Sequence, residues 1–294
     1  MLIKIENVSV YNNFDSSNTK TNVYVEDGVV TYVGNNIKKD VDKVIEGENL
    51  AILPNFEFLN FEQCDNYNIF NLNNLSEESL EKQLDSFKND KLTFMFLENP
   101  TELEGEYDVI VPFCKKHNIK IVAVAGRTLN EMGECDKMHG VTPIGYLEEF
   151  GVLDLEPIIL SAANLEKEDL EKLSYYNATI CLSVTFDWLN GNGLAQMPLI
   201  KKYNLNVMFE CSNIFKEIYS AYFLPAGYLK IANAIDCLDV LNCACFGLNK
   251  AINVNKPVCE VGKQVNFMVV NNFSGFESFV LNGKDEQIVC KFRA

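Results

Sequence analysis

Few residues in this chain are of the types that usually hold metal ions or activate nucleophiles. There are two histidines, His117 and His139, and ten cysteines with no C-x-x-C spacing among them. The closest pair of cysteines is Cys243 and Cys245, a spacing that could place two thiolates on one metal ion. The pair lies in an apolar, helix-like stretch, however, where small buried thiols that fill a helix face are the simpler interpretation.

The charge of the chain restricts its partners. The 294 residues include 25 Lys and Arg against 41 Asp and Glu, which gives a formal net charge of −16. Nucleic acids and anionic membranes carry the same sign of charge, so we expect neither as a partner. No apolar run approaches the length of a membrane span, and the first residues contain no signal-like apolar stretch. We therefore expect a cytoplasmic protein with reduced cysteines.

The two ends of the chain have β character. Residues 22–36 contain two β-rich runs around Asp27-Gly28, which is a hairpin signal. Residues 261–292 repeat this character, and Asn282-Gly283 predicts a second hairpin turn there. We therefore expect the two ends to pair in space and to form one β-sandwich-like domain of residues 1–50 and 255–294.

The middle of the chain, residues 51–254, alternates short apolar runs with amphipathic segments. Short apolar runs fit strands that are buried on both faces of a parallel sheet. Between them, Ser76 is a candidate helix N-cap, and Leu80, Leu84 and Phe87 share one helix face. This rhythm predicts an α/β fold. The six strand candidates are residues 51–59, 92–99, 120–126, 157–164, 179–186 and 206–213.

Several segments, taken in order, resemble the amidohydrolase superfamily. The run VYVEDGVVTYVG followed by NLAILPNFEFLNFE is similar to the superfamily's opening strand pair and its first barrel strand, P-G-F-x-D-x-H-x-H. Residues 140–184, 199–213 and 241–255 resemble the branch that contains cytosine, guanine and S-adenosylhomocysteine deaminases and the related chlorohydrolases. The resemblance implies a TIM-barrel-like domain over residues 51–254 beside the small β-sandwich. With six strand candidates instead of eight, an incomplete barrel stays open.

The superfamily's chemistry requires histidines and a carboxylate that hold Zn²⁺ or Fe²⁺, which activates a bound water. The two histidines of this chain match none of those positions. Asn, Ser and Val supply no imidazole or anionic ligand, and an arginine cannot shuttle a proton. We therefore expect no metal and no other cofactor. By resemblance, the ligand and proton-shuttle positions fall on Asn60, Glu62, Val124, Arg127, Ser161, Asn164 and Ser212.

The same resemblance predicts where a pocket would lie, at the carboxyl ends of the strands. A guanidinium at Arg127 would bind a carboxylate or phosphate of a ligand there, and an ion pair with a nearby acid is the simpler alternative. The glycine-containing turn 190–193 could cradle an anion or could be a plain connection. The candidate pocket residues are Asn60, Glu62, Arg127, Ser161, Asn164, Thr185 and Ser212.

The lost ligand positions favour a catalytically inactive amidohydrolase-like protein, a pseudoenzyme with no catalytic residue that does not deaminate nucleobase-like compounds. Its function would then be to bind a small molecule with an anionic group, or a protein partner in a homo- or hetero-oligomer. The alternative is a hydrolase that acts on C–N bonds other than peptide bonds through an altered site, with or without a metal. Its reactive groups would come from Glu62, Glu210 or Cys211.

Overall fold

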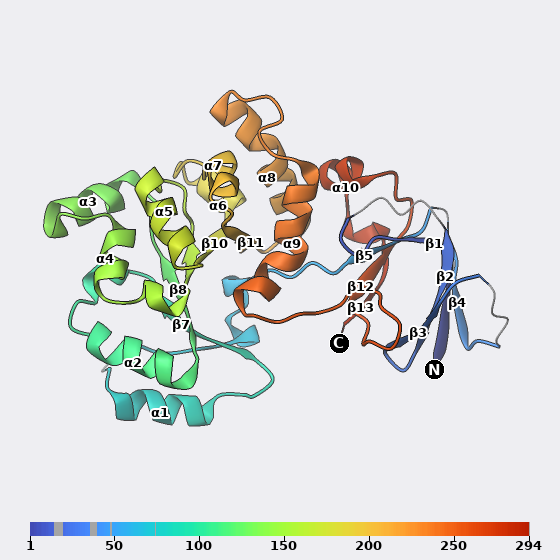
Figure 1. The fold of residues 1–294 in the computed structure, drawn as a ribbon, viewed down its shortest axis with the longest axis horizontal. Coiled ribbons are helices and arrows are strands. Elements are labelled where there is room, and N and C mark those ends of the chain that lie inside the picture. The colour runs from blue at the N-terminus through green and yellow to red at the C-terminus, as the bar shows by residue number, and fades with distance from the viewer. Residues whose placement is uncertain (15–19, 36–39, 48, 74, 294) are drawn as a thin grey trace.

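The computed structural model describes residues 1–14, 20–35, 40–47, 49–73 and 75–293. These residues form a mixed α/β fold with two sheets, one of seven strands and one of six parallel strands (Figure 1). Helices cover the parallel sheet, while the seven-stranded sheet lies beside it and contains both ends of the chain (Figure 1). The predicted α/β class is therefore confirmed.

The seven-stranded sheet has the order β13-β12-β5-β1-β2-β3, with β4 beside β1. Strand β5 pairs in parallel with β1 and antiparallel with β12, so the amino-terminal and carboxyl-terminal segments meet within one sheet. A two-layered sandwich made from both ends, and the division into domains, stay predictions. The strands are β1 (Leu2–Val10), β2 (Thr21–Glu26), β3 (Val29–Val33), β4 (Lys43–Ile45), β5 (Ala51–Pro54), β12 (Phe267–Val270) and β13 (Ile288–Phe292).

One of the two predicted hairpin turns is present. Asp27 and Gly28 connect β2 to β3 with φ angles of 49° and 80°, the left-handed conformations that such a turn requires. Asn282-Gly283 is not a hairpin turn, because residues 276–282 form the helix α10 (Phe276–Asn282) and Gly283 ends it. The cause is tertiary packing: Phe279 and Val280 share a helix face that is buried, and Phe279 contacts the ring of Phe215.

The six-stranded sheet has the order β11-β10-β9-β8-β7-β6 and is parallel throughout. The strand expected over residues 51–59 is wrong in part, since β5 belongs to the other sheet. Of this run, Leu59 forms a single bridge to Glu210 beside β11. Strand β6 was not predicted. The strands are β6 (Tyr67–Ile69), β7 (Leu92–Leu97), β8 (Lys120–Val124), β9 (Ile158–Leu160), β10 (Thr179–Leu182) and β11 (Asn206–Phe209).

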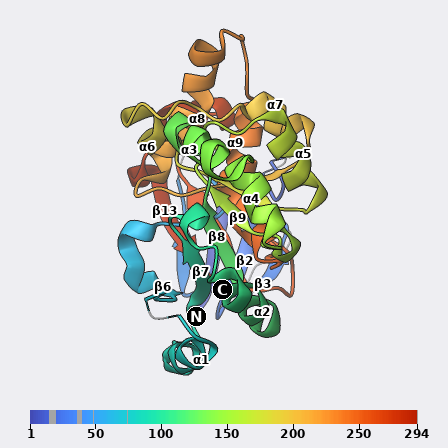
Figure 2. The ribbon, with the colours of Figure 1, turned by 90° about the vertical axis from the view of Figure 1, so that its left-hand side faces the viewer.

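The helices lie between these strands in sequence, and Figure 2 shows several of them side by side over the parallel sheet. Ser76 caps the first helix as predicted, with the Ser79 amide donating to Ser76 Oγ at 3.2 Å. His139 is the last residue of α3. The helices are α1 (Glu77–Ser86), α2 (Tyr107–His117), α3 (Leu129–His139), α4 (Pro143–Glu149), α5 (Lys167–Tyr175), α6 (Val184–Leu189), α7 (Met197–Lys202), α8 (Ile214–Leu229) and α9 (Cys237–Ala251).

Within the described ranges, no helix combines the length and the apolar composition that a membrane crossing requires. The cytoplasmic location stays a prediction, and so do the absence of nucleic acid as a partner and the oligomeric state.

Alternate side chains of the parallel strands meet in one interior cluster, to which Leu59 also belongs. The intervening side chains, such as Ile121 and Ile180, pack outward against the helices. Because strands from opposite edges share this interior, the sheet must curl around it. The cluster contains Leu59, Phe94, Val122, Val124, Ile158, Leu160, Cys181, Met208, Leu248 and Ala251.

Helix α9 packs against β11 at a point where there is no room for a side chain. A Cβ atom on Gly247 would lie 2.1 Å from the Val207 carbonyl oxygen and 2.8 Å from Met208 Cα. Both neighbours are backbone atoms of a central packing layer, so neither can move away without displacing the strand.

We predict opposite effects for two Gly→Ala substitutions in helices. Gly247→Ala should lower the free energy of unfolding by about 1–3 kcal/mol or more, because it overpacks the contact with β11. Gly133→Ala in α3 meets nothing within 4 Å and should raise it by about 0.5–1 kcal/mol through helix propensity. Urea denaturation of both variants measures the difference, and equal effects would contradict the packing argument.

Candidate functional site

The carboxyl ends of strands β8, β9, β10 and β11 lie along one rim of the parallel sheet, and a polar residue follows each of them. Arg127 comes after β8, Ser161 directly after β9, Ser183 directly after β10 and Glu210 directly after β11. Active sites of barrels of parallel strands form at this rim, since successive loops meet there.

A chain of hydrogen bonds connects three of these elements. Arg127 Nε donates to Ser161 Oγ at 3.1 Å, and Ser161 Oγ donates to Asp187 Oδ1 at 3.2 Å. Asn192 Nδ2 donates to the same carboxylate oxygen at 2.9 Å. Ser161 is fully buried and has a φ of 77°, which is rare for a residue with a side chain and is typical of functional sites.

Asp187 is the carboxylate at the centre of this chain. Its side chain lies in α6 and is 3 % exposed, and burial raises its pKa, although the hydrogen bonds from Asn192 and Ser161 and the charge of Arg127 oppose the shift. Its second oxygen, Oδ2, accepts no hydrogen bond from the described residues. Oδ2 is also not one of the fully enclosed side-chain atoms without a partner, so it is not sealed from solvent. Oδ2 is therefore the atom that water or a ligand can reach.

Arg127 is held at its backbone and has a free guanidinium end. Glu131 accepts hydrogen bonds from the Gly126 and Arg127 amides, at 2.9 and 2.8 Å. The guanidinium carbon lies 5.5 Å from the centre of the Phe186 ring, a cation–π contact. Within the described part of the chain, Arg127 makes no ion pair. The simpler alternative from the sequence, an ion pair with a nearby acid, is therefore not observed there.

Two further carboxylates, Glu210 on the rim and Glu217 on α8, accept hydrogen bonds near the start of α6. Glu210 accepts from Ser183 Oγ at 2.7 Å and from the Phe61 amide at 3.3 Å. Glu217, from α8, accepts from the Val184 and Thr185 amides and is 1 % exposed. It therefore caps the amino end of α6, and burial raises its pKa to about 7.

Of the predicted pocket residues, the structure brings three together. Asn164 donates to the Arg127 carbonyl oxygen at 2.8 Å and to the Asn192 carbonyl oxygen at 3.0 Å, next to the contact between Arg127 and Ser161. Thr185 lies on α6 but is not hydrogen-bonded to these three, because its hydroxyl donates to Ser220 Oγ at 3.2 Å.

The remaining predicted residues, Asn60, Glu62 and Ser212, do not take part in the series of hydrogen bonds through Ser161 and Asp187. Asn60 is buried and its Oδ1 accepts from the Glu62 amide, so these two residues form a local turn. The side chains of Glu62 and Ser212 are exposed. One pocket lined by all seven residues stays a prediction.

Asp187 and Glu217 were missed by the sequence analysis. The signal for Asp187 is a single acid between Phe186 and Trp188, directly after the apolar run 179–186. Cys211, considered as a nucleophile, is 9 % exposed, and burial raises the pKa of its thiol far above the ordinary value. It would therefore carry almost no thiolate at neutral pH.

Comparison with known proteins places this geometry in context. No family model matches the chain. It is 24 % identical over 172 residues to a 5-methylthioadenosine/S-adenosylhomocysteine deaminase of Thermoanaerobacter pseudethanolicus, covering 55 % of this chain and 40 % of that protein. It is 22 % identical over 164 residues to a 5'-deoxyadenosine deaminase of Methanothermobacter thermautotrophicus, covering 53 % and 38 %. The matches thus span about two fifths of these relatives.

Solved structures match over nearly the whole chain. An adenosine deaminase from Xanthomonas campestris with bound zinc aligns with a TM-score of 0.74 and 12 % identity, covering 98 % of this chain and 90 % of that one. A guanine deaminase from C. acetobutylicum aligns with a TM-score of 0.73 and 14 % identity, covering 99 % and 98 %. A triazine hydrolase variant aligns with a TM-score of 0.74 and 12 % identity, covering 98 % and 92 %. The resemblance to the amidohydrolase superfamily is confirmed.

These comparisons correct the functional expectation. The prediction of a catalytically inactive protein is wrong, since the curated relatives are named as deaminases and none of the comparisons indicates a loss of activity. They favour the alternative, a hydrolase of the deaminase and chlorohydrolase type.

A zinc centre of the superfamily type does not fit the donor groups of the residues that the structure describes. Among the described residues, no three His, Cys, Asp or Glu side chains are arranged so that they could hold a metal ion. His117 Nε2 lies 2.9 Å from Glu81 Oε1, and the His139 ring lies against Tyr146, both on outer helices. The chemistry of the site must therefore be argued from its carboxylates, hydroxyls and guanidinium.

We predict that Glu217 gives folding stability a pH dependence. In the folded protein Glu217 takes up a proton near pH 7, whereas its ordinary pKa is 4.5. The folded state binds more protons between these values, so this contribution to stability falls by up to about 3 kcal/mol as pH rises from 4.5 to 7.

Urea denaturation between pH 4.5 and 8 tests this expectation. The difference between the wild type and Glu217→Gln should change with pH in that direction, while Glu168→Gln, an exposed control, should show no such change. A Glu217→Gln difference that is constant with pH would contradict the raised pKa.

Proposed function

We propose that this protein is a hydrolase that breaks C–N bonds other than peptide bonds, in the manner of a deaminase, through a site altered from the superfamily's metal centre. The observation that carries the proposal is Asp187, a buried carboxylate with one free oxygen, fixed at the rim by Ser161 and Asn192. The names of the curated relatives support the reaction class.

Asp187 has the properties of a general base. Its Oδ2 takes a proton from water while the water oxygen forms a bond to the ring carbon that carries the amino group. The proton then passes from Asp187 to the leaving nitrogen, the C–N bond breaks, and ammonia departs. Burial raises the pKa of Asp187, and a raised pKa makes its carboxylate a stronger base than an exposed aspartate.

Ser161 and Arg127 are positioning residues in this scheme. The Ser161 hydroxyl accepts from Arg127 Nε and therefore directs its own proton to Asp187 Oδ1. This fixes the carboxylate and leaves Oδ2 for the reaction. The positive charge of Arg127 also opposes the rise in the pKa of Asp187 that burial causes.

The substrate class follows from the surface beside the base. Phe186 precedes Asp187, is 50 % exposed and lies under the guanidinium of Arg127. A flat aromatic ring on a substrate can stack on such a side chain. We therefore propose an amino-substituted heteroaromatic ring as the group that is hydrolysed.

Ammonia release from purified full-length protein tests the proposal. The substrates are 5'-deoxyadenosine, S-adenosylhomocysteine and guanine, each assayed with and without a metal chelator. We expect activity that the chelator leaves unchanged and that Asp187→Asn lowers by about 10²-fold or more, the usual contribution of a general base. Asp136→Asn, an exposed acid on α3, is the matched control and should keep full activity.

Two results would overturn this scheme. Activity that Asp187→Asn leaves intact would remove Asp187 from the mechanism. Activity that the chelator abolishes would show that a metal, and not the carboxylate, activates the water.

A further inference from the structure

A second candidate site, which includes none of the residues hydrogen-bonded to Asp187, is a cavity of about 620 Å³. Its walls come from the residues that follow β1, from α9 and from the connection between α9 and β12, which Figure 1 shows running from α9 toward the seven-stranded sheet. The volume suits a small molecule. We call it the amide cavity, because its lining includes the side chains of Asn12, Asn13, Asn242, Asn249 and Asn255.

Asn249 is the residue that folding alone does not explain. It is 6 % exposed, and its Oδ1 is enclosed without a hydrogen-bond partner. An unpaired buried polar atom costs about 1–3 kcal/mol, which a leucine at this position would avoid. The amide nitrogen has no hydrogen bond among the described residues and is not enclosed, so it is the donor that Asn249 offers to the cavity.

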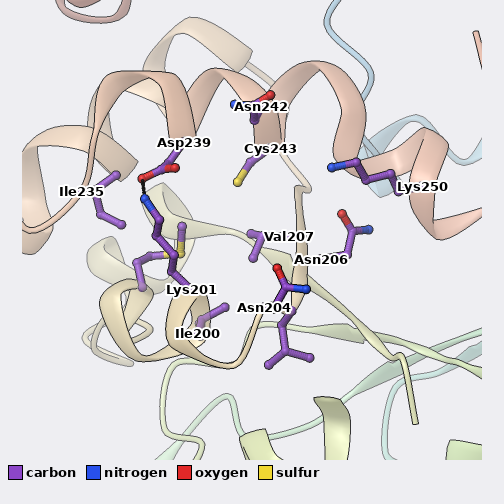
Figure 3. A pocket seen from close by; sticks show the side chains of 12 residues that line it. Ile200, Lys201, Asn204, Asn206, Val207, Ile235, Asp239, Asn242, Cys243 and Lys250 are labelled. Atoms are coloured by element: carbon purple, nitrogen blue, oxygen red, sulfur yellow. Dashed lines mark hydrogen bonds and ion pairs between the residues drawn. The ribbon is translucent and has the colours of Figure 1, made fainter. Parts of the chain in front are cut away.

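The residue after Asn249 in α9 is a lysine that has no ion pair among the described residues. Lys250 lines the amide cavity and, within the described ranges, pairs with no carboxylate. Lys256, also in the lining, lies 3.4 Å from Glu57. Figure 3 shows the neighbouring cavity, which shares Asn242 and Lys250, and there Lys201 is neutralised by Asp239 at 2.6 Å. Lys250 is thus a cation with an unmatched charge in a chain of net charge −16.

The wall opposite α9 is fixed before any ligand arrives. Asn12 Nδ2 donates to the Cys259 carbonyl oxygen at 3.4 Å, and the Cys259 amide donates to Asn12 Oδ1 at 3.1 Å. This reciprocal pair ties the connection after α9 to the end of β1. A preformed cavity loses less conformational entropy when it binds a ligand.

Acceptor groups complete the lining. Asn242 Nδ2 donates to the Leu238 carbonyl oxygen at 2.8 Å, which leaves Asn242 Oδ1 as the atom for a ligand. Glu260 also lines the cavity. A ligand therefore meets donors at Asn249 and Lys250 and acceptors at Asn242 and Glu260.

We propose that the amide cavity binds a small molecule with a phosphate or carboxylate group, held by Lys250 and the Asn249 amide nitrogen. A hydroxyl on the same molecule would donate to Asn242 or Glu260. The cavity shares no lining residue with the hydrogen-bonded chain of Asp187, so its occupancy does not depend on the proposed hydrolase activity.

Isothermal titration calorimetry of the full chain at constant ionic strength tests this site, with inorganic phosphate and with malate as probes. We expect saturable, one-to-one binding of at least one probe, and the probe that binds identifies the anionic group. Asn249→Leu and Lys250→Gln should each weaken binding by at least tenfold. Lys202→Gln on α7 makes the same change in charge away from the amide cavity and should bind as the wild type does.

The variants also report on folding. Asn249→Leu removes an unpaired buried oxygen, so its thermal midpoint should equal or exceed that of the wild type. Lys250 is exposed, and its replacement should leave the midpoint unchanged. Absence of saturable binding of either probe, or binding that either variant leaves intact, would overturn the proposal.

Discussion

The interior cluster of the parallel sheet is the constraint on which the candidate site depends. Val124 and Leu160 belong to it and are 5 % and 4 % exposed. Burying such side chains contributes about 1.5–3 kcal/mol each, enough to fix where each strand ends. Ser161 directly follows Leu160, and Arg127 follows Val124 after a short turn. Their hydrogen bond is therefore a consequence of apolar packing below the rim.

A second constraint is the cost of the buried carboxylates. Asp187 and Glu217 are almost wholly buried, and the hydrogen bonds that each accepts offset part of the cost of that burial. Glu217 is satisfied by the first amides of α6, so it fixes the turn between β10 and that helix. The same turn presents Asp187 to Ser161. One buried acid thus positions the other, and the raised pKa of both follows from the same burial.

The sequence predicts what periodicity and turn chemistry encode. Five of the six apolar runs are strands of the parallel sheet, and Ser76 and Asp27-Gly28 act as their types indicate. Prediction from the sequence fails where the structure of a segment depends on residues far away along the chain. Residues 51–54 join the other sheet because they pair with β12, more than 200 residues away. Asp187 was missed because its partner Ser161 is 26 residues away and a lone acid has no recognisable spacing.

The same reasoning explains why empty ligand positions misled the functional prediction. A count of histidines tests only whether a metal ion can activate water. It also considers each ligand position separately and ignores the residues hydrogen-bonded to it. Hydrolysis also requires a group that accepts a proton and returns it, and burial can prepare a carboxyl for that role without any imidazole. Ser161 illustrates the difference, because it binds no metal well, yet its left-handed backbone and its contacts with Arg127 and Asp187 show a residue whose conformation the site dictates. A position that lacks a metal ligand can therefore still have a role in the site. Its hydrogen-bonded partners in the structure show what that role is.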